Sequence, residues 1–270
     1  MMDSGKSSFS AIVLAADREH GNPVAATAGV RCKSLAPVEG VPMLFRVLTA
    51  LEESGQIDDI LLCGPPEAVV AEDRALSEAI ATGRARWIAN RQTPSLSTLA
   101  AIDVQPVARP LLVTTSDHAL LSPPMVQHFC DQAVLSGCDV VAAVASHQTV
   151  TSSYPQTTRT AYRFRDGAYC SCNLFAFLTP DSRCVPAFWR RVERQRKNPL
   201  RVVATLGWLT VLRYLLGRLT LAEVMDQLSQ RLGCRAGVVE MPFAEAAIDV
   251  DTPADYRFVE EILAGRVTTR

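Results

Sequence analysis

The sequence contains no Cys-x-x-Cys pair, although eight cysteines are spread over its 270 residues. Repeated pairs are typical of zinc ribbons, and dense cysteines of disulfide-stapled secreted domains, so neither class is favoured and a reducing compartment is expected. A formal net charge of −1 gives no overall attraction to nucleic acid. The first ten residues lack the apolar core of a secretion signal, and no window is long and apolar enough for a membrane-spanning helix. We therefore expect a cytoplasmic protein that does not bind nucleic acid.

The clearest local pattern lies near the start of the chain. The apolar run at 11–16 predicts a buried strand of a parallel sheet, and the small and polar residues after Arg18 predict a loop that leads to Lys33. A Gly-Val-Pro turn at 40–42 then introduces an amphipathic helix over 43–54. Ligands of α/β sheets bind beside the carboxyl ends of the strands, and cationic side chains suit phosphate. Arg18 and Lys33 are therefore candidate ligands of a polyphosphate.

Strand and helix patterns alternate along most of the chain, which is typical of an α/β domain with a mostly parallel sheet. Further strands are expected at 57–64, 85–89, 110–115, 139–144 and 172–177. Helices are expected at 67–80, 96–104, 122–137 and 253–263, with Ser95 or Ser97 capping the second of them. The polar stretch 146–167 predicts antiparallel strands and loops over the site. We expect one domain over residues 1–270 with a helical insertion at about 183–233.

Three motifs follow one another over nearly the whole chain. The first is Leu-Ala-Ala at 14–16, followed by Lys-x-Leu-x-Pro-Val-x-Gly-x-Pro-Met-Leu at 33–44. The second is Leu-Leu-Val-Thr-Thr-Ser-Asp at 111–117, and the third is Asp-Val-Asp-Thr-Pro-Ala-Asp at 249–255. Together they resemble the MobA-like NTP transferase family. The resemblance implies a three-layer Rossmann-like α/β fold of the GT-A type, and Mg²⁺-dependent transfer of a nucleotide from an NTP to a phosphorylated small molecule with release of pyrophosphate.

The resemblance also assigns roles to individual residues. Lys33, Asp117 and Asp251 would be catalytic, with the two aspartates as Mg²⁺ ligands and Asp249 as the alternative to Asp251. Two carboxylates from distant strand ends can hold a divalent cation together with substrate oxygens, while a lysine neutralises triphosphate charge. The residues expected to contact the nucleotide are Ala15, Ala16, Arg18, Lys33, Ser95 and Ser97.

The chain departs from the family pattern at one point. The usual Gly-x-Gly after Leu-Ala is replaced by Ala16-Asp17-Arg18, so the phosphate cradle is altered. Asn173 resembles a position near the acceptor, and His118 is either a neighbour of the metal ligands or a structural residue.

Each of these residues also has a plain structural explanation. Asp117 would be a turn residue or a helix cap, Lys33 a solvated side chain, and the two serines helix caps. The run from Thr252 to Pro253 would start the last helix, and Asp255 is better explained by that role than by metal binding. A helix start there is compatible with metal binding just before it.

A basic segment interrupts the second half of the chain. Residues 183–218 carry nine Lys or Arg against one acid, a net +8, so the rest of the chain carries −9. Two helices are expected, broken near Asn198-Pro199, and the second, at 202–216, is apolar nearly all round. The segment is either a helical subdomain with a solvated basic rim or a surface that meets an anionic membrane or a polyanionic acceptor.

Two other functions are compatible with the sequence. A glycosyltransferase of related fold would use a nucleotide-sugar, but such enzymes usually keep two close carboxylates at the end of the middle strand, where this chain has Asp117 alone. A non-catalytic nucleotide-binding regulator would explain the lost Gly-x-Gly, although the three expected catalytic residues are retained. The close pair Cys170 and Cys172 is either a metal or redox pair or two small strand residues.

Overall fold

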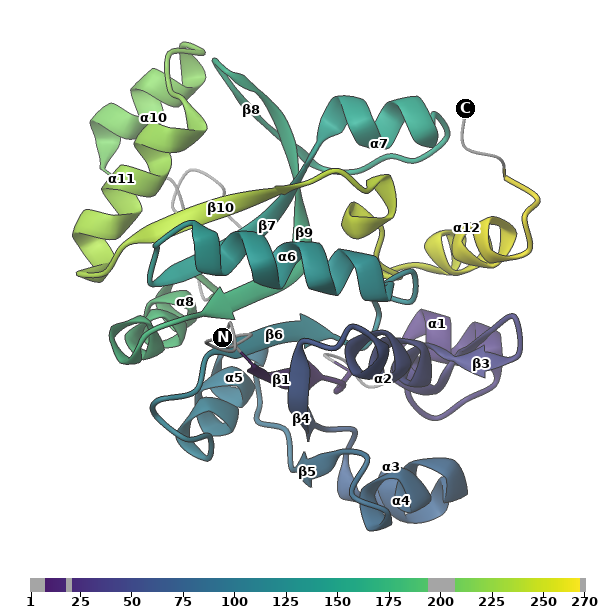
Figure 1. Cartoon of the computed structure of the whole chain (residues 1–270). Coiled ribbons are helices and arrows are strands. Elements are labelled where there is room, and N and C mark those ends of the chain that lie inside the picture. Colours follow the sequence, from purple (N-terminus) through teal and green to yellow (C-terminus); the bar gives the residue numbers. More distant parts are fainter. Residues whose placement is uncertain (1–7, 18–20, 194–206, 268–270) are drawn as a thin grey trace, which may run out of the picture.

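The structure is a computed structural model that describes residues 8–17, 21–193 and 207–267. Its centre is an eight-stranded sheet in the order β10-β7-β9-β6-β1-β4-β5, with β8 paired to β9 (Figure 1). The strands are β1 Phe9–Leu14, β4 Ile57–Cys63, β5 Arg86–Ile88, β6 Leu111–Thr115, β7 Val140–Ser146, β8 Ala161–Phe164, β9 Gly167–Phe177 and β10 Ala236–Met241. A separate antiparallel pair is formed by β2 Pro37–Val38 and β3 Val41–Pro42.

The sheet is mostly parallel, as the alternation of strands and helices predicts. The pairings β1–β4, β1–β6, β4–β5 and β7–β10 are parallel, whereas β9 is antiparallel to β6, β7 and β8. Strand β1 has a partner on each side, and its residues Phe9 to Val13 are buried on both faces. Burial on both faces explains why the run from Ala11 onward is continuously apolar rather than alternating.

Helices cover both faces of the sheet (Figure 1). They are α1 Pro23–Ala28, α2 Met43–Glu53, α3 Glu67–Glu72, α4 Arg74–Ala81, α5 Pro94–Asp103, α6 Pro123–Leu135, α7 His147–Ser153, α8 Val185–Glu193, α10 Trp208–Leu215, α11 Leu221–Leu232 and α12 Pro253–Leu263. Side chains of α2 and α6 share one core cluster with Phe9 and Val13, and those of α5 and α8 share another with Ile12. The three-layer α/β architecture is therefore confirmed.

A third apolar cluster positions the carboxyl ends of the strands. It joins Val24 of α1, Leu120 from the loop after β6, Tyr154 and Tyr256 of α12. Beside it, the amide of Val250 donates a hydrogen bond to the carbonyl oxygen of Asp117 at 3.0 Å. The last motif of the sequence is thereby held against the end of the middle strand.

In the first part of the chain, the helices differ from the sequence prediction at two places. The loop expected after Arg18 contains α1, whose start has an Asn22 side chain that accepts from the amides of Val24 and Ala25 and a proline at the first turn. The single helix expected at 67–80 is two helices, because the Asp73 carboxylate accepts from Leu76 N at 2.8 Å and begins α4.

One further local prediction was wrong, and another was confirmed only in part. Helix α5 is capped by Thr93, whose hydroxyl accepts from Leu96 N, and not by Ser95 or Ser97. The polar stretch after β7 starts with α7 before the antiparallel β8–β9 pair begins. In contrast, α12 begins as expected at Pro253, with Thr252 and Asp255 forming a reciprocal capping box.

The described parts of the basic segment contain α8 and α10. The break expected at Asn198-Pro199 and the start of the helix expected at 202–216 lie outside the described residues. A helix that is apolar all round was expected to be either buried or interfacial, and four leucines on or next to α10 are substantially exposed. Their exposed fractions are 57% for Leu209, 45% for Leu212, 67% for Leu215 and 58% for Leu216. No helix among the described residues is long and apolar enough to cross a membrane.

Candidate functional site

Lys33 lies at the centre of the site and links all three motifs. Its backbone amide donates to both carboxylate oxygens of Asp17, at 3.1 and 3.0 Å, just beyond β1. Its ammonium group contacts Asp117 Oδ2 at 2.5 Å, the Val250 carbonyl oxygen at 3.0 Å and Asp251 Oδ1 at 3.5 Å. The lysine is therefore fixed at its backbone by the first motif and at its side-chain end by the other two.

Asp117 is a turn residue two positions after β6, and its side chain is only 13% exposed. Thr115 donates to its other oxygen, Oδ1, at 2.5 Å. Burial opposes ionisation of Asp117, but the charge and hydrogen bond of Lys33 and the hydroxyl of Thr115 outweigh it and hold the pKa below its ordinary value. Burial likewise works against the ammonium of Lys33, yet Asp117 prevails and raises the pKa of the lysine. Both groups are ionised at neutral pH.

Asp249 lies beside this cluster in a different environment. The Arg159 guanidinium contacts its Oδ1 and, at 2.6 Å, its carbonyl oxygen, while Asn173 Nδ2 donates to its Oδ2 at 2.9 Å. Burial and then the charges of Asp117 and Asp251 raise the pKa of Asp249. Because both carboxylate oxygens of Asp249 already have partners, Asp251, with a side chain 62% exposed, is the freer of the two.

The oxygen atoms around the Lys33 ammonium suit a hard cation. Two carboxylates and a carbonyl converge on one positively charged atom, and Mg²⁺ is usually held by one or two carboxylates with substrate phosphates and water. In the described parts of the chain, no group of three or more His, Cys, Asp and Glu side chains could hold a metal ion by itself. A divalent cation here would therefore share its ligands between Asp117, Asp251 and the substrate.

A comparison with protein families gives a match to the MobA-like NTP transferase domain over residues 11–232. The chain belongs to this family. The matched range contains Lys33 and Asp117 and ends before Asp251. No curated protein matches the chain.

Solved structures place the MobA-like chain among nucleotidyltransferase folds. A hypothetical transferase from Thermus thermophilus has a TM-score of 0.76 and 29% identity, covering 92% of this chain and 99% of that one. The 4-diphosphocytidyl-2C-methyl-D-erythritol synthase of Anaerococcus prevotii has a TM-score of 0.58 and 15% identity, with coverage of 96% and 97%. A CMP:2-keto-3-deoxy-manno-octonic acid synthetase complexed with CTP has a TM-score of 0.56 and 12% identity, with coverage of 96% and 100%. At these low identities the last two show the fold alone.

In this MobA-like chain, the residues expected to contact the nucleotide are only partly brought together. A small cavity next to the end of β1 is lined by Leu14, Ala16, Asp17, Cys63, Arg91, Gln92, Thr93, Pro94 and Ser97. The Ser97 hydroxyl accepts from the amide of Arg91 at 2.8 Å and so shapes that loop. Ser95 is buried with its hydroxyl 3.0 Å from that of Thr93, and Ala15 is buried in the core. Arg18 lies outside the described residues.

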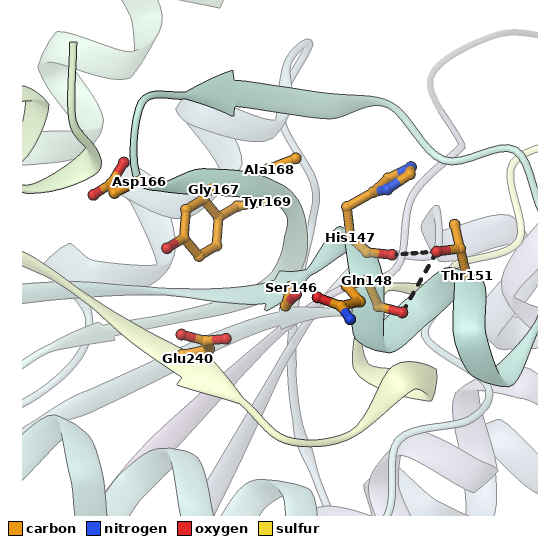
Figure 2. A pocket seen from close by; sticks show the side chains of 9 residues that line it. All are labelled: Ser146, His147, Gln148, Thr151, Asp166, Gly167, Ala168, Tyr169 and Glu240. Carbon is orange, nitrogen blue, oxygen red and sulfur yellow. Dashed lines mark hydrogen bonds between the residues drawn. The ribbon is translucent and has the colours of Figure 1, made fainter. Parts of the chain in front are cut away.

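A second and larger cavity, of about 520 Å³, shares no residue with the Lys33 cluster. It lies between the end of β7, the β8–β9 hairpin and β10, and Figure 2 shows Tyr169 between Asp166 and Glu240. Burial, and then these two carboxylates, raise the pKa of Tyr169. The wall on the other side is formed by Ser146, His147, Gln148 and Thr151. The family motifs assign no role to this cavity.

Two residues of the site were missed in the sequence. Asp17 stands where the family has a glycine-rich turn, and it clamps the backbone of Lys33 instead. Arg159 is 12% exposed and pairs with Asp249 and, at 3.4 Å, with Asp255. The sequence placed Arg159 only in a polar stretch, and its partners lie 90 and more positions away. Such a pairing has no local signal.

The environment of the two close cysteines favours the explanation that they are two small strand residues. Cys170 and Cys172 are free, buried residues of β9, and burial raises the pKa of both thiols. Buried, protonated thiols are poor nucleophiles and poor metal ligands. A metal or redox role therefore gains no support.

His118 is buried next to Asp117, and its burial predicts a pH effect on stability. Its side chain is 1% exposed, and burial lowers its pKa from 6.5 to about 4. The unfolded chain therefore binds a proton below pH 6.5, whereas the folded chain does so only near pH 4, so stability falls as the pH is lowered between these values. The loss amounts to about 3 kcal/mol for such a shift.

The measurement is urea unfolding between pH 7 and pH 4 for wild type, His118→Gln and the control His147→Gln, whose side chain is half-buried. We expect the decline in the free energy of unfolding to be shallower in His118→Gln alone. An equal decline in all three proteins would contradict the assignment.

Proposed function

We propose that the chain transfers a nucleoside monophosphate from an NTP to a phosphorylated small-molecule acceptor and releases pyrophosphate. The observation that carries this proposal is the convergence of Lys33, Asp117 and Asp251 at the carboxyl ends of β1 and β6. An acceptor phosphate is already an anion, so the reaction needs charge neutralisation and alignment more than proton transfer. The cluster contains a positive charge that would neutralise the triphosphate and two carboxylates that would hold a metal ion.

The residues present would divide the work. Asp117 and Asp251 would hold Mg²⁺, which, when bound, neutralises charge on the phosphate oxygens. Lys33 would contact the triphosphate, and Asp17 would keep its backbone in place. An acceptor phosphate oxygen then attacks the α-phosphorus as its bond to the β-phosphate oxygen breaks, and pyrophosphate leaves. Asn173, whose amide donates to Asp249, would lie near the acceptor, as the family resemblance implies.

The alternatives agree less well with the site. A glycosyltransferase usually has two close carboxylates after the middle strand, whereas Asp117 is followed here by the buried, neutral His118. A non-catalytic regulator would not need an ionised Asp117 paired with a lysine.

A screen for pyrophosphate release tests the proposal. The purified chain is incubated with each of the four NTPs and Mg²⁺, together with a set of sugar and alcohol phosphates. We expect release that depends on one NTP, on one acceptor and on the metal. Transfer from a nucleotide-sugar without pyrophosphate release would favour the glycosyltransferase instead.

Replacing Lys33 by alanine should weaken triphosphate binding and turnover together. A charge-assisted contact to phosphate contributes about 1.5–3 kcal/mol, equivalent to roughly 10- to 150-fold in affinity. Calorimetric titration with the NTP that the screen identifies is the measurement, and Arg86→Ala, which removes a cation paired with Asp59 at the surface, is the control. Unchanged affinity and turnover in Lys33→Ala would place this lysine outside the site.

We also propose that α10 meets an anionic membrane surface or the acceptor. Leu209, Leu212 and Leu216 recur at helical spacing on one side and are exposed, and Arg213 and Arg218 lie close by. Apolar side chains beside basic ones are typical of interfacial helices. Co-sedimentation with anionic vesicles at low salt is expected for wild type and not for a variant with these leucines changed to asparagine. Without such binding, and with an unchanged acceptor KM in the variant, both versions of this proposal fail.

A further inference from the structure

The Lys33 ammonium occupies the position that the proposed function assigns to a divalent cation. It lies 2.5 Å from Asp117 Oδ2, 3.0 Å from the Val250 carbonyl oxygen and 3.5 Å from Asp251 Oδ1. The two carboxylates are those expected to hold the metal, and the side chains of Lys33 and Asp117 are both only 13% exposed. The ammonium therefore stands in for the ion, with the same oxygen neighbours.

The contact of Lys33 with Asp117 has a clear electrostatic reason. A carboxylate this buried would be strongly unfavourable without a positive partner. Within the described ranges, the ion pair of Asp117 is with Lys33, while Arg159 is taken up by Asp249 and Asp255. Lys33 thus supplies the charge that keeps Asp117 ionised.

This arrangement conflicts with the substrate-bound state. A divalent cation held by both Asp117 and Asp251 would compete with the ammonium for the position between these carboxylates, because two positive charges that close together repel each other. Lys33 is also the group expected on the triphosphate. Its backbone is clamped by Asp17 at 3.1 and 3.0 Å, so only its side chain is free to change position.

We propose that Lys33 is an exchangeable counter-ion: it neutralises Asp117 and Asp251 in the empty site, and a divalent cation arriving with the NTP displaces it onto the triphosphate. This inference rests on the proposed function and adds a coupling between binding of the divalent cation and binding of the NTP. Without the NTP, the metal ion must displace the Lys33 ammonium, which then has no new partner, so the metal ion binds weakly. With the NTP present, the lysine gains the phosphates, so metal and nucleotide bind cooperatively.

The first test measures Mn²⁺ binding without nucleotide by electron paramagnetic resonance. Removing the competing charge in Lys33→Met should raise the affinity for Mn²⁺ alone by about tenfold or more. Lys33→Gln, whose amide can still donate to Asp117, provides a second variant if the first is unstable. Arg86→Met removes one positive charge at the surface, and its affinity should stay within about twofold of wild type.

The possible outcomes distinguish a failure of the proposed exchange from a failure of the proposed function. Equal Mn²⁺ affinity in wild type and in folded Lys33→Met and Lys33→Gln would overturn the exchange and leave the proposed function standing. No Mn²⁺ binding in any variant, with or without an NTP, would overturn the metal site and with it the proposed function.

A second measurement uses the wild-type chain. It has three lysines, Lys6, Lys33 and Lys197, so acylation by an amine-reactive ester can be followed at each by mass spectrometry. Labelling of Lys33 should accelerate in step with Mn²⁺ occupancy, while Lys6 and Lys197 serve as internal references. A constant Lys33 labelling rate at saturating Mn²⁺ would contradict displacement.

Discussion

Asp117→Asn is expected to lower kcat/KM by about 100- to 1,000-fold, equivalent to about 3–4 kcal/mol of transition-state stabilisation. The substitution keeps the shape of the side chain and its contact with Thr115, but it removes the charge that would hold the metal and that now holds Lys33. Asp251→Asn should also remove most activity. The measurement is pyrophosphate release at saturating Mg²⁺, with circular dichroism as a check of folding.

Asp166→Asn is the matched control, since this carboxylate lines the separate cavity beside Tyr169. Its activity should equal that of wild type. If Asp117→Asn and Asp251→Asn both kept near-normal turnover at saturating Mg²⁺, the assignment of the site would be wrong.

The largest effect on stability is expected for Arg159→Met. Its guanidinium is 12% exposed and satisfies Asp249, which Asn173 contacts from the other side. Breaking a buried ion pair by removing one partner leaves an uncompensated charge and costs about 3–5 kcal/mol. Asp249 also feels the charges of Asp117 and Asp251, so its isolation in the variant is especially unfavourable. Urea denaturation gives the free energy of unfolding.

Two further variants make this result specific. Arg86→Met breaks the ion pair with Asp59, in which the arginine is 49% exposed, and should cost at most about 1 kcal/mol. Adding Asp249→Asn to Arg159→Met removes the stranded charge and should recover part of the loss. A cost below about 1 kcal/mol for Arg159→Met alone would contradict a stabilising role.

The parts of the fold that the sequence predicted are those with local signals. The apolar run of β1 and the Thr-Pro start of α12 depend on neighbouring residues, and both elements were expected within about two residues of where they lie. The start of α1 had such a signal in Asn22-Pro23 but was hidden in a stretch rich in small residues. Helix α7 had none, because its Thr and Ser residues favour loops.

The residues of the candidate site also fall into those with a local sequence signal and those without one. Lys33, Asp117 and Asp251 follow motif positions, and their convergence was expected because strand ends meet at one edge of a parallel sheet. The clamp of Asp17 on the Lys33 backbone and the pairing of Arg159 with Asp249 depend on tertiary contacts between distant segments. Such contacts are set by packing, and no spacing in the sequence indicates them.

The antiparallel strand β9 also determines the order in which the molecule can be assembled. It is the strand between β6 and β7, so the half-sheet of β5, β4, β1 and β6 and the pair of β7 and β10 are joined through residues 167–177. During synthesis from the N-terminus, the first half-sheet can form early, while β7 waits for β9 and then for β10. Lys33 and Asp117 are synthesised before β9, and Asp251 is synthesised after it. A ribosome-bound chain that has passed β6 therefore contains Lys33 and Asp117 but lacks Asp251, so the proposed metal site can be completed only after β9 and β10 have been synthesised.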